Sequence, residues 1–530
     1  MPEYSLSDYH ERSKHRLDRY APGPRGLDWA SQPDPFRRYE GCALVELPLA
    51  AEALEVRWAD IRAARPPAAR PLDLGSIALL FELSLAVSAW KSYGGTSWAL
   101  RCNPSSGNLH PTEGYLVAGA IPGIEAGVYH YASREHALER RGAWQDAPAL
   151  GGVLVGLASI HWREAWKYGM RAYRYCQHDC GHALAALAYA AACLGWRARL
   201  LEEPGDAEVS ALLGLDRDGD YAGAEREVPE ALLWIAPADR DAPALPHPPE
   251  RWAGRANRLS QGHVAWPDID AVERLATKPR TVPERPVRTP AAPAPVRGDA
   301  SAAAVIRGRR SAVAFDGATS ITAEAFFAML DATLPRAAPP WSAWPGPALV
   351  HPAIFVHRVE GLEPGLYLLV REPAALDALR AAMRRDWLWR KTGPVGLPLH
   401  LLLAHDLRGA AQSVSCHQEI AADSCFALGM LARFGAARAE PWRYRALHWE
   451  CGMLGQVLYL EAEAAGIRGT GIGCFFDDEM HGLVGLRDTE WQTLYHFTAG
   501  GAVEDTRLTT LPAYMHRRHE LARAGTVIPS

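Results

Sequence analysis

The chain is organised around the stretch Ile306-Arg-Gly-Arg-Arg-Ser-Ala-Val-Ala-Phe315, in which two guanidinium groups precede a hydroxyl shortly before a helical pattern. Arginine carries a rigid fork of N–H donors that matches the oxygens of a phosphate group. The start of a helix nearby would add free N–H groups and a favourable dipole. The stretch therefore predicts a phosphate clamp, and a basic surface turn is the alternative.

The composition is that of an ordinary globular protein. The chain has 530 residues, of which 48% are hydrophobic and 22% are charged, with a formal net charge of −5. This charge gives no general attraction to nucleic acid or to an anionic membrane, and no apolar run approaches the roughly 18 residues of a membrane span. The segment Met1–Leu6 is not an apolar secretion signal, and the nine cysteines include no CxxC pair. We therefore expect a cytoplasmic protein without a disulfide framework, a zinc site or another metal centre.

Composition and periodicity divide the chain into two α+β units. Residues 1–50 are polar and irregular, which predicts an arm that packs on the body of the protein. The first unit is predicted at 51–238 and the second at 303–515, with a helix expected at about 72–87 in the first. Residues 239–302 are rich in proline and arginine, which is typical of a linker, and 266–276 within them has the pattern of a short helix.

The second unit repeats the first. Gly361-Leu-Glu-Pro-Gly-Leu-Tyr367 matches Gly123-Ile-Glu-Ala-Gly-Val-Tyr129, and Tyr444–Gly452 matches Tyr173–Gly181. The offset between the repeats grows from 238 residues at the first match to 271 at the second, and we place the additional residues at 411–436, as a helical segment. Because each unit has one long apolar helix, we expect the two units to form an intramolecular pseudo-dimer. The chain is then a monomer, and further oligomerisation is left open.

These motifs resemble those of the FMN-dependent nitroreductase superfamily, and the SagB-type dehydrogenase branch in particular, which includes the azoline dehydrogenases of modified-peptide biosynthesis. The resemblance is carried by Asn103-Pro-Ser-Ser-Gly-Asn-Leu-His-Pro111, Gly127-Val-Tyr-His-Tyr131, Lys167–Tyr175 with Gly181-His182, and Arg309-Arg-Ser311. It implies two fused nitroreductase-like domains of the α+β class, with FMN held between them.

The resemblance also implies one complete set of cofactor-binding residues. The second unit would supply Arg309, Arg310, Ser311, Gly471, Ile472, Gly473 and Arg507, and the first unit Pro104, Ser105, Ser106, Gly107 and Asn108. Glycines beside the ring suit a slot in which backbone N–H groups reach the flavin, and a flexible strand end is the alternative. The residue two places after the clamp serine is often basic in the family but is Val313 here, which weakens the predicted phosphate grip.

The reciprocal site reads as dismantled. The first unit has Ala64-Arg-Pro-Pro-Ala68 where the clamp should stand, and the second unit has Pro340-Trp-Ser-Ala-Trp-Pro345 in place of the serine-rich turn. We therefore predict one working site, with the two tryptophans filling the other as core residues.

Lys167 and Tyr168 are the predicted catalytic pair, because the SagB-type branch carries a Lys-Tyr pair at this place. A lysine that is desolvated beside an aromatic ring can take a proton near neutral pH, whereas Arg438, the counterpart of Lys167 in the second unit, cannot. The alternative is an ordinary lysine that packs on a helix face.

Three functions remain open from the sequence. The first is a SagB-type dehydrogenase that oxidises a C–N or C–heteroatom bond, such as an azoline in a peptide. The second is an NAD(P)H-dependent reductase of nitro or quinone compounds, and the third is a flavin-free scaffold in a peptide-modifying complex. The sequence does not identify the small-molecule or peptide substrate.

Overall fold

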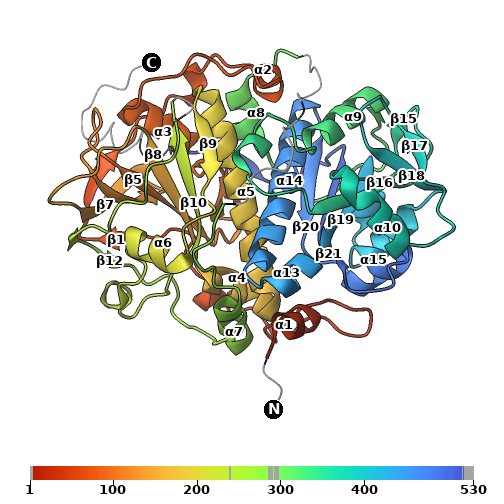
Figure 1. The fold of residues 1–530 in the computed structure, drawn as a ribbon, viewed down its shortest axis with the longest axis horizontal. Helices are drawn as coiled ribbons and strands as arrows, with labels where there is room; N and C mark the ends of the chain where they lie inside the picture. The colour runs from red at the N-terminus through yellow and green to blue at the C-terminus, as the bar shows by residue number, and fades with distance from the viewer. Residues whose placement is uncertain (1–3, 238–239, 284–290, 292–297, 516, 518–530) are drawn as a thin grey trace.

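The computed structural model of the chain describes residues 4–237, 240–283, 291, 298–515 and 517. Two antiparallel sheets lie on either side of two long helices, α5 (Ala172–Cys193) and α14 (Arg443–Ala464), which run side by side through the middle of the molecule (Figure 1). Among the described residues, no helix combines the length and the apolar character that a membrane crossing needs. The predicted α+β class with two fused repeats is confirmed.

The first sheet has the strand order β11-β7-β6-β5-β8-β10-β9, and β2 is added beside β7. The central strands β5 and β8 are buried along their whole length, because helices cover one face and further apolar side chains cover the other. The strands are β2 (Ala43–Glu46), β5 (Thr112–Ala118), β6 (Gly127–Ala132), β7 (Ala137–Ala143), β8 (Val153–Ser159), β9 (Arg197–Leu200), β10 (Val228–Ala236) and β11 (Arg251–Trp252).

The second sheet repeats this topology over six of its strands. Its order is β17-β18-β16-β14-β19-β21-β20, so that β18-β16-β14-β19-β21-β20 corresponds to β7-β6-β5-β8-β10-β9. The strands are β14 (Val350–Val356), β16 (Gly365–Leu369), β17 (Arg390–Thr392), β18 (Leu399–Ala404), β19 (Phe426–Arg433), β20 (Arg468–Ile472) and β21 (Trp491–Gly500).

The prediction of an additional helical segment at 411–436 is wrong in its second half. Short helices α11 (Arg408–Val414) and α12 (Glu419–Ala422) are present, but Phe426–Arg433 is the central strand β19, the counterpart of β8. A short apolar run that is buried on both faces has the same composition in a strand and in a helix, so periodicity does not separate the two. Most of the additional residues lie instead between β16 and β18, in 370–398, where β6 and β7 are joined by a short turn.

Helices α5 and α14 cross where Gly181 meets Gly452, which are equivalent positions of the repeat. A Cβ atom on Gly181 would lie 2.2 Å from the carbonyl oxygen of Trp449, and one on Gly452 would lie 2.2 Å from that of His178. Only glycine allows two helix backbones to approach this closely. All 22 residues of α5 are buried, which confirms the predicted central apolar helix of the first unit.

Each end of the described chain packs against the opposite unit. Helix α1 (Leu6–Arg12) belongs to the N-terminal arm, yet its His10 contacts Tyr444 and Gln492 of the second unit, each at 3.2 Å. Strand β22 (Thr509–Pro512) lies near the end of the second unit and pairs with β3 (Val87–Tyr93) of the first unit, which forms a hairpin with β4 (Thr96–Arg101). These exchanges hold the units together beyond the α5–α14 contact.

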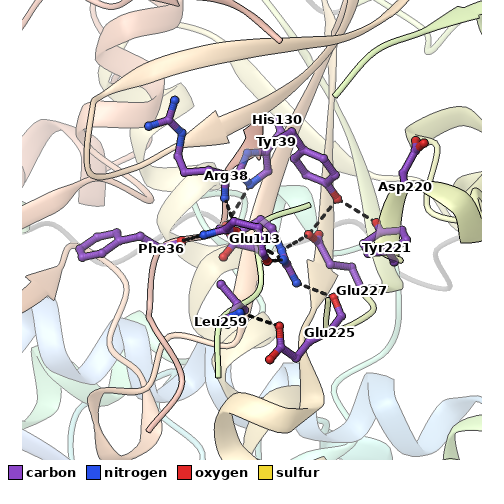
Figure 2. A network of polar contacts seen from close by, with 12 residues as sticks. Phe36, Arg38, Tyr39, Glu113, His130, Asp220, Tyr221, Glu225, Glu227 and Leu259 are labelled. Carbon is purple, nitrogen blue, oxygen red and sulfur yellow. Dashed lines mark hydrogen bonds and ion pairs between the residues drawn. The ribbon is translucent and has the colours of Figure 1, made fainter. Parts of the chain in front are cut away.

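A buried polar network attaches the arm to the first sheet (Figure 2). The Tyr39 hydroxyl donates to Glu227 at 2.9 Å, and the Tyr39 backbone N–H donates to Glu139 at 2.9 Å. His130 lies between the carboxylates of Glu139 and Glu113, at 2.9 and 3.2 Å. Although burial opposes it, these two carboxylates raise the pKa of His130 to about 9. The charges of this network are compensated inside it, which is the pattern of a structural site.

The remaining elements complete the two units. The predicted helix at 72–87 is shorter in the structure, because β3 begins at Val87, and the predicted linker helix at 266–276 is present as α7. Four prolines of the predicted linker, at 286, 290, 293 and 295, lie outside the described residues. The helices are α2 (Trp58–Arg62), α3 (Leu74–Glu82), α4 (His161–Tyr168), α6 (Asp206–Leu213), α7 (Pro267–Leu275), α8 (Ala302–Gly308), α9 (Ala323–Ala332), α10 (Leu376–Ala382), α13 (Gly435–Ala439) and α15 (Asp477–Val484), and the two-residue ladders are β1 (Tyr39–Glu40) with β12 (Arg255–Ala256) and β13 (Ile321–Thr322) with β15 (Val359–Glu360).

Candidate active site

A cavity of about 490 Å³ lies between the two units and collects most of the predicted site residues. The first unit contributes the turn at 103–108, Tyr168 and one face of α5, and the second unit contributes 309–313, the end of β20 and Cys474. Neither unit could form this cavity alone, because each supplies only one side of it.

The predicted clamp follows α8 directly and bridges the units. Arg309, only 4% exposed, donates to the carbonyl oxygens of Arg101 at 2.8 Å and Cys102 at 3.2 Å, both in the first unit. The hydroxyl of Ser311 lies 2.8 Å from that of Tyr459 on α14. Arg309 is therefore both a cavity residue and a tie across the interface.

Positive charge gathers in the same cavity. Arg310 and Arg468 line it together with Arg309, and Arg468 pairs with Glu463. Burial, helped by the neighbouring charge of Arg309, lowers the pKa of Arg310 to about 10. A lowered arginine pKa means that the charged form is poorly compensated, so an anion such as a phosphate would stabilise this corner.

The serine-rich turn is held by α5. Ser106 donates to the Asp179 carboxylate through its backbone N–H and its hydroxyl, both at 3.1 Å. Ser105 Oγ accepts from the backbone N–H of His110 at 2.8 Å, and the Asn108 side chain donates to the carbonyl of Ala99 at 2.8 Å. The turn from Pro104 onward is therefore a rigid wall of the cavity.

The glycine strand packs against tyrosine rings. A Cβ atom on Gly471 would lie 1.9 Å from the Tyr495 hydroxyl, and one on Gly473 would lie 2.4 Å from the ring of Tyr175. The backbone N–H of Gly471 donates to the hydroxyl of Tyr459 at 2.8 Å. These glycines, with Ile472 between them, bring backbone close to aromatic rings at the cavity wall, where any larger side chain would clash.

The two predicted catalytic residues reach the turn from the end of α4. A Cβ atom built on Gly107 would lie 2.5 Å from the Tyr168 hydroxyl and 3.1 Å from Lys167 Nζ, so both polar ends meet at that glycine. Lys167 Nζ also lies 5.2 Å from the centre of the Tyr168 ring. Burial raises the pKa of Tyr168 well above its ordinary value, so its hydroxyl remains a proton donor.

Two buried carboxyl groups lie behind the turn. Burial raises the pKa of Asp179 to about 7, although its hydrogen bonds to serines act in the other direction. Burial and the nearby Asp179 raise the pKa of Glu164 well above its usual range. A carboxyl group that changes protonation near neutral pH at the wall of a cavity, as Asp179 does, is typical of an active site.

Two of the predicted residues, Lys167 and Arg507, are not among those that line the cavity. Arg507 is exposed and pairs with Asp505 at 2.8 Å, at the rim, while Val313 lines the cavity beside the clamp. The sequence reasoning missed Asp179 and Arg468. Both carried a signal, since Asp179 follows Tyr175 by one helical turn within the quoted motif, and Arg468 directly precedes the first glycine of β20.

A second cavity, of about 330 Å³, occupies the equivalent place of the repeat. It is lined by the end of β9, by 344–347 and by α14, but not by the predicted counterpart of the clamp at 64–68. Trp344 lines this cavity, whereas Trp341 is buried in the core and donates to the carbonyl of Ala332 at 2.7 Å. The guanidinium of Arg438 pairs with Glu490 at 3.0 Å.

Comparison with solved structures decides the fold. The crystal structure of a provisionally assigned nitroreductase from Anabaena variabilis matches 94% of this chain and 100% of its own, with a TM-score of 0.70 and 23% sequence identity. The chain has the nitroreductase fold. Because the match runs through both units, that structure shares the tandem arrangement of this chain. The recognition made from the sequence motifs is confirmed at the level of the fold.

One curated protein adds a relation at the sequence level. The trifolitoxin-processing protein TfxB of Rhizobium leguminosarum bv. trifolii is 36% identical over 149 residues, which make up 25% of this chain. The chain matches 40% of the length of that relative. No family model matches the sequence.

Proposed function

We propose that the chain is an FMN-dependent oxidoreductase of the SagB-type dehydrogenase branch, with one FMN bound between the units. The observation that carries the proposal is the convergence of Arg309, Arg310 and Ser311 from one unit with the Pro104–Asn108 turn from the other, in one cavity. The nitroreductase fold and the partial similarity to a trifolitoxin-processing protein support it. A modified peptide is accordingly the proposed class of substrate.

The positive charge and the glycine-containing wall of the cavity support the proposal that FMN binds there. The poorly compensated guanidinium groups of Arg309 and Arg310 would hold the phosphate, with Ser311 as a further donor. The glycine strand at 471–473 would lie beside the ring, and the turn at 104–108 would cover it from the first unit. Bound FMN would supply a two-electron acceptor for hydride.

Lys167 and Tyr168 would carry out the proton transfer and the orientation of the substrate. Oxidation of a carbon next to nitrogen requires loss of a proton as well as a hydride, and Lys167 Nζ is the basic atom at the turn. Tyr168, which remains protonated, would donate a hydrogen bond to the substrate. Asp179 and Glu164 would hold the turn in place behind them. The substrate bond, the direction of the redox reaction and a cytoplasmic location remain predictions.

The first test is the flavin content of the purified full-length protein. We expect one FMN per chain from the absorbance released on denaturation, and two FMN per chain would exclude the single-site proposal. Mixing the loaded protein with NAD(P)H under anaerobic conditions separates the two redox functions. Rapid bleaching of the flavin by NAD(P)H alone would favour the nitro or quinone reductase, and a protein that binds no flavin would favour the scaffold.

A further inference from the structure

Two thiol groups that are far apart in the sequence meet at the edge of the cavity. The Sγ atoms of Cys416 and Cys474 lie 2.9 Å apart, and both residues are half-buried. Cys474 follows the glycine strand and lines the cavity, while Cys416 stands between α11 and α12. Of the other seven cysteines only Cys42 is half-buried and the rest are buried, so this pair combines proximity with access.

The surroundings of the pair favour a thiolate on Cys474. The contact with Cys416 holds the pKa of Cys474 below its ordinary value, and the nearby His15 and Arg171 act in the same direction. His15 Nδ1 accepts from the backbone N–H of Ala21 at 3.0 Å, which leaves the proton on the other ring nitrogen. A thiolate is the nucleophile in disulfide exchange, so Cys474 is the attacking group of the pair.

The backbone holds the two thiols in place. Cys416 and His417 have φ angles of +54° and +59°, a region that residues other than glycine seldom adopt. The side-chain amide of Gln418 donates to the carbonyl oxygens of Ser415 at 2.7 Å and Cys474 at 2.9 Å, and so fastens one loop to the other. A strained loop that is fixed beside a reactive group is typical of a functional site.

We propose that Cys416 and Cys474 form a dithiol–disulfide site that reacts with low-molecular-weight disulfides. The Cys474 thiolate attacks one sulfur of such a disulfide, which forms a mixed disulfide and releases one thiolate. Cys416 then attacks the Cys474 sulfur, its proton goes to the second departing thiolate, and the intramolecular S–S bond forms. The two cysteines are oxidised by two electrons, and the small disulfide is reduced to one thiolate and one thiol.

This step needs little movement of the protein. The two Sγ atoms must approach from 2.9 Å to about 2.05 Å, a change smaller than about 1 Å. The new bond would join the loop after β20 to the loop between α11 and α12, at the cavity wall. The proposal goes beyond the flavin reaction and does not depend on it, because the small disulfide is the oxidant.

The test uses the full-length protein treated with oxidised glutathione, followed by alkylation and peptide mapping. We expect a cross-linked Cys416–Cys474 peptide with no retained glutathione in the wild type, and one glutathione trapped on Cys474 in Cys416→Ser. Cys42→Ser is the matched control and should cross-link like the wild type, because burial raises the pKa of Cys42 to about 11. We also expect Cys474 to react about tenfold or more faster than Cys42 at pH 7.

Two results would overturn the proposal. One is a wild-type protein that keeps glutathione on Cys474 without cross-linking, which would remove Cys416 from the reaction. The other is a protein in which Cys42 reacts while both cysteines of the pair stay reduced. Neither result depends on flavin content, so the outcome is independent of the proposed oxidoreductase activity.

Discussion

Asp179 on α5 and Glu450 on α14 occupy the same position of the repeat but have opposite surroundings. Glu450 pairs with Arg371 and accepts from the backbone N–H of Leu349 at 3.0 Å, so its charge is compensated within the protein. Asp179 accepts from Ser106 instead, and in the described part of the chain no cationic side chain pairs with it. One repeat thus uses the position for stability, and the other keeps an uncompensated carboxyl group at a cavity.

The segments that follow α5 and α14 also differ between the two repeats. Gly471 and Gly473 bring the backbone of the second unit against tyrosine rings, whereas the equivalent positions of the first unit are Leu200 and Glu202. Side chains there occupy space that the glycine strand leaves open. The two repeats thus share one framework, but at this position only the second brings glycine backbone against aromatic rings at a cavity wall.

The largest expected effect concerns Lys167 and its counterpart Arg438. We expect Lys167→Ala to lower turnover by about 10²–10⁴-fold while flavin content is unchanged, because the proton acceptor is lost. Arg438→Ala is the matched control and should leave turnover unchanged, since its guanidinium pairs with Glu490 on the surface of the second unit. Steady-state kinetics and flavin absorbance measure the two properties, and full turnover in Lys167→Ala would remove the lysine from the mechanism.

The second effect concerns the clamp and its counterpart. We expect Arg309→Ala to weaken FMN binding by about 100-fold, because charged hydrogen bonds to phosphate are worth about 1.5–3 kcal/mol. Arg65→Ala should bind FMN like the wild type, since Arg65 is exposed and pairs with Asp60. Fluorescence titration measures both affinities.

Arg309 also joins the two units, so a control for folding is needed. Arg309→Lys keeps a positive charge but loses the fork of donors, and it should bind FMN with intermediate affinity. Equal losses in Arg309→Ala and Arg65→Ala would contradict the difference between the two sites.

The third effect distinguishes Glu450 from Asp179 by stability. We expect Glu450→Gln to lower the free energy of unfolding by about 3–5 kcal/mol, because it leaves the buried charge of Arg371 unpaired. Asp179→Asn should cost much less, since no buried cation loses its partner. Urea unfolding at fixed flavin concentration measures the free energy of unfolding of both variants. Equal decreases would show that the two carboxylates contribute equally to stability.

The pH dependence of Asp179→Asn follows from the raised pKa of Asp179. The folded state holds this proton up to about pH 7, whereas the unfolded chain releases it at about pH 3.8. The wild-type contribution of this group to stability therefore falls as the pH rises from about 4 to about 7, by up to about 1.4 kcal/mol per pH unit. Asp179→Asn removes this fall, so its stability relative to the wild type should increase with pH, as urea midpoints at several pH values would reveal.

The smallest expected effect concerns the two late basic residues. Arg507→Ala should weaken FMN binding by less than about threefold, because its guanidinium is exposed and already pairs with Asp505. Arg468→Ala should have a larger effect, since Arg468 lines the cavity. The same fluorescence titration compares the FMN affinities of the two variants. A greater loss of affinity in Arg507→Ala than in Arg468→Ala would support the cofactor-binding role that the resemblance implies for Arg507.

Much of the fold could be predicted from local patterns. The duplicated motifs around Gly127 and Gly365 predicted two units, and the long Ala- and Leu-rich run predicted α5. The prediction was wrong for Phe426–Arg433, which is buried on both faces, so that neither the alternation of a strand nor the face of a helix appears in its residues. The additional residues at 370–398 were placed too late in the chain for the same reason.

The candidate site was predictable where a motif is contiguous. Arg309–Ser311 and the turn at 104–108 each carry their chemistry in adjacent residues, and both line the cavity. Arg507 could not be placed, because a charge in a loop has no periodicity that reports where its side chain points.

The sequence by itself determined the duplication, the central helices and the residues available on each side of an interface, because these depend on patterns within one segment. Only the tertiary structure decided which groups meet. Asp179 reaches Ser106 across 73 residues, and Cys416 reaches Cys474 across 58. Such contacts arise when α5 packs against the turn before β5 and when β19 pairs with β21. The spacing of residues along one strand or helix carries no record of that packing.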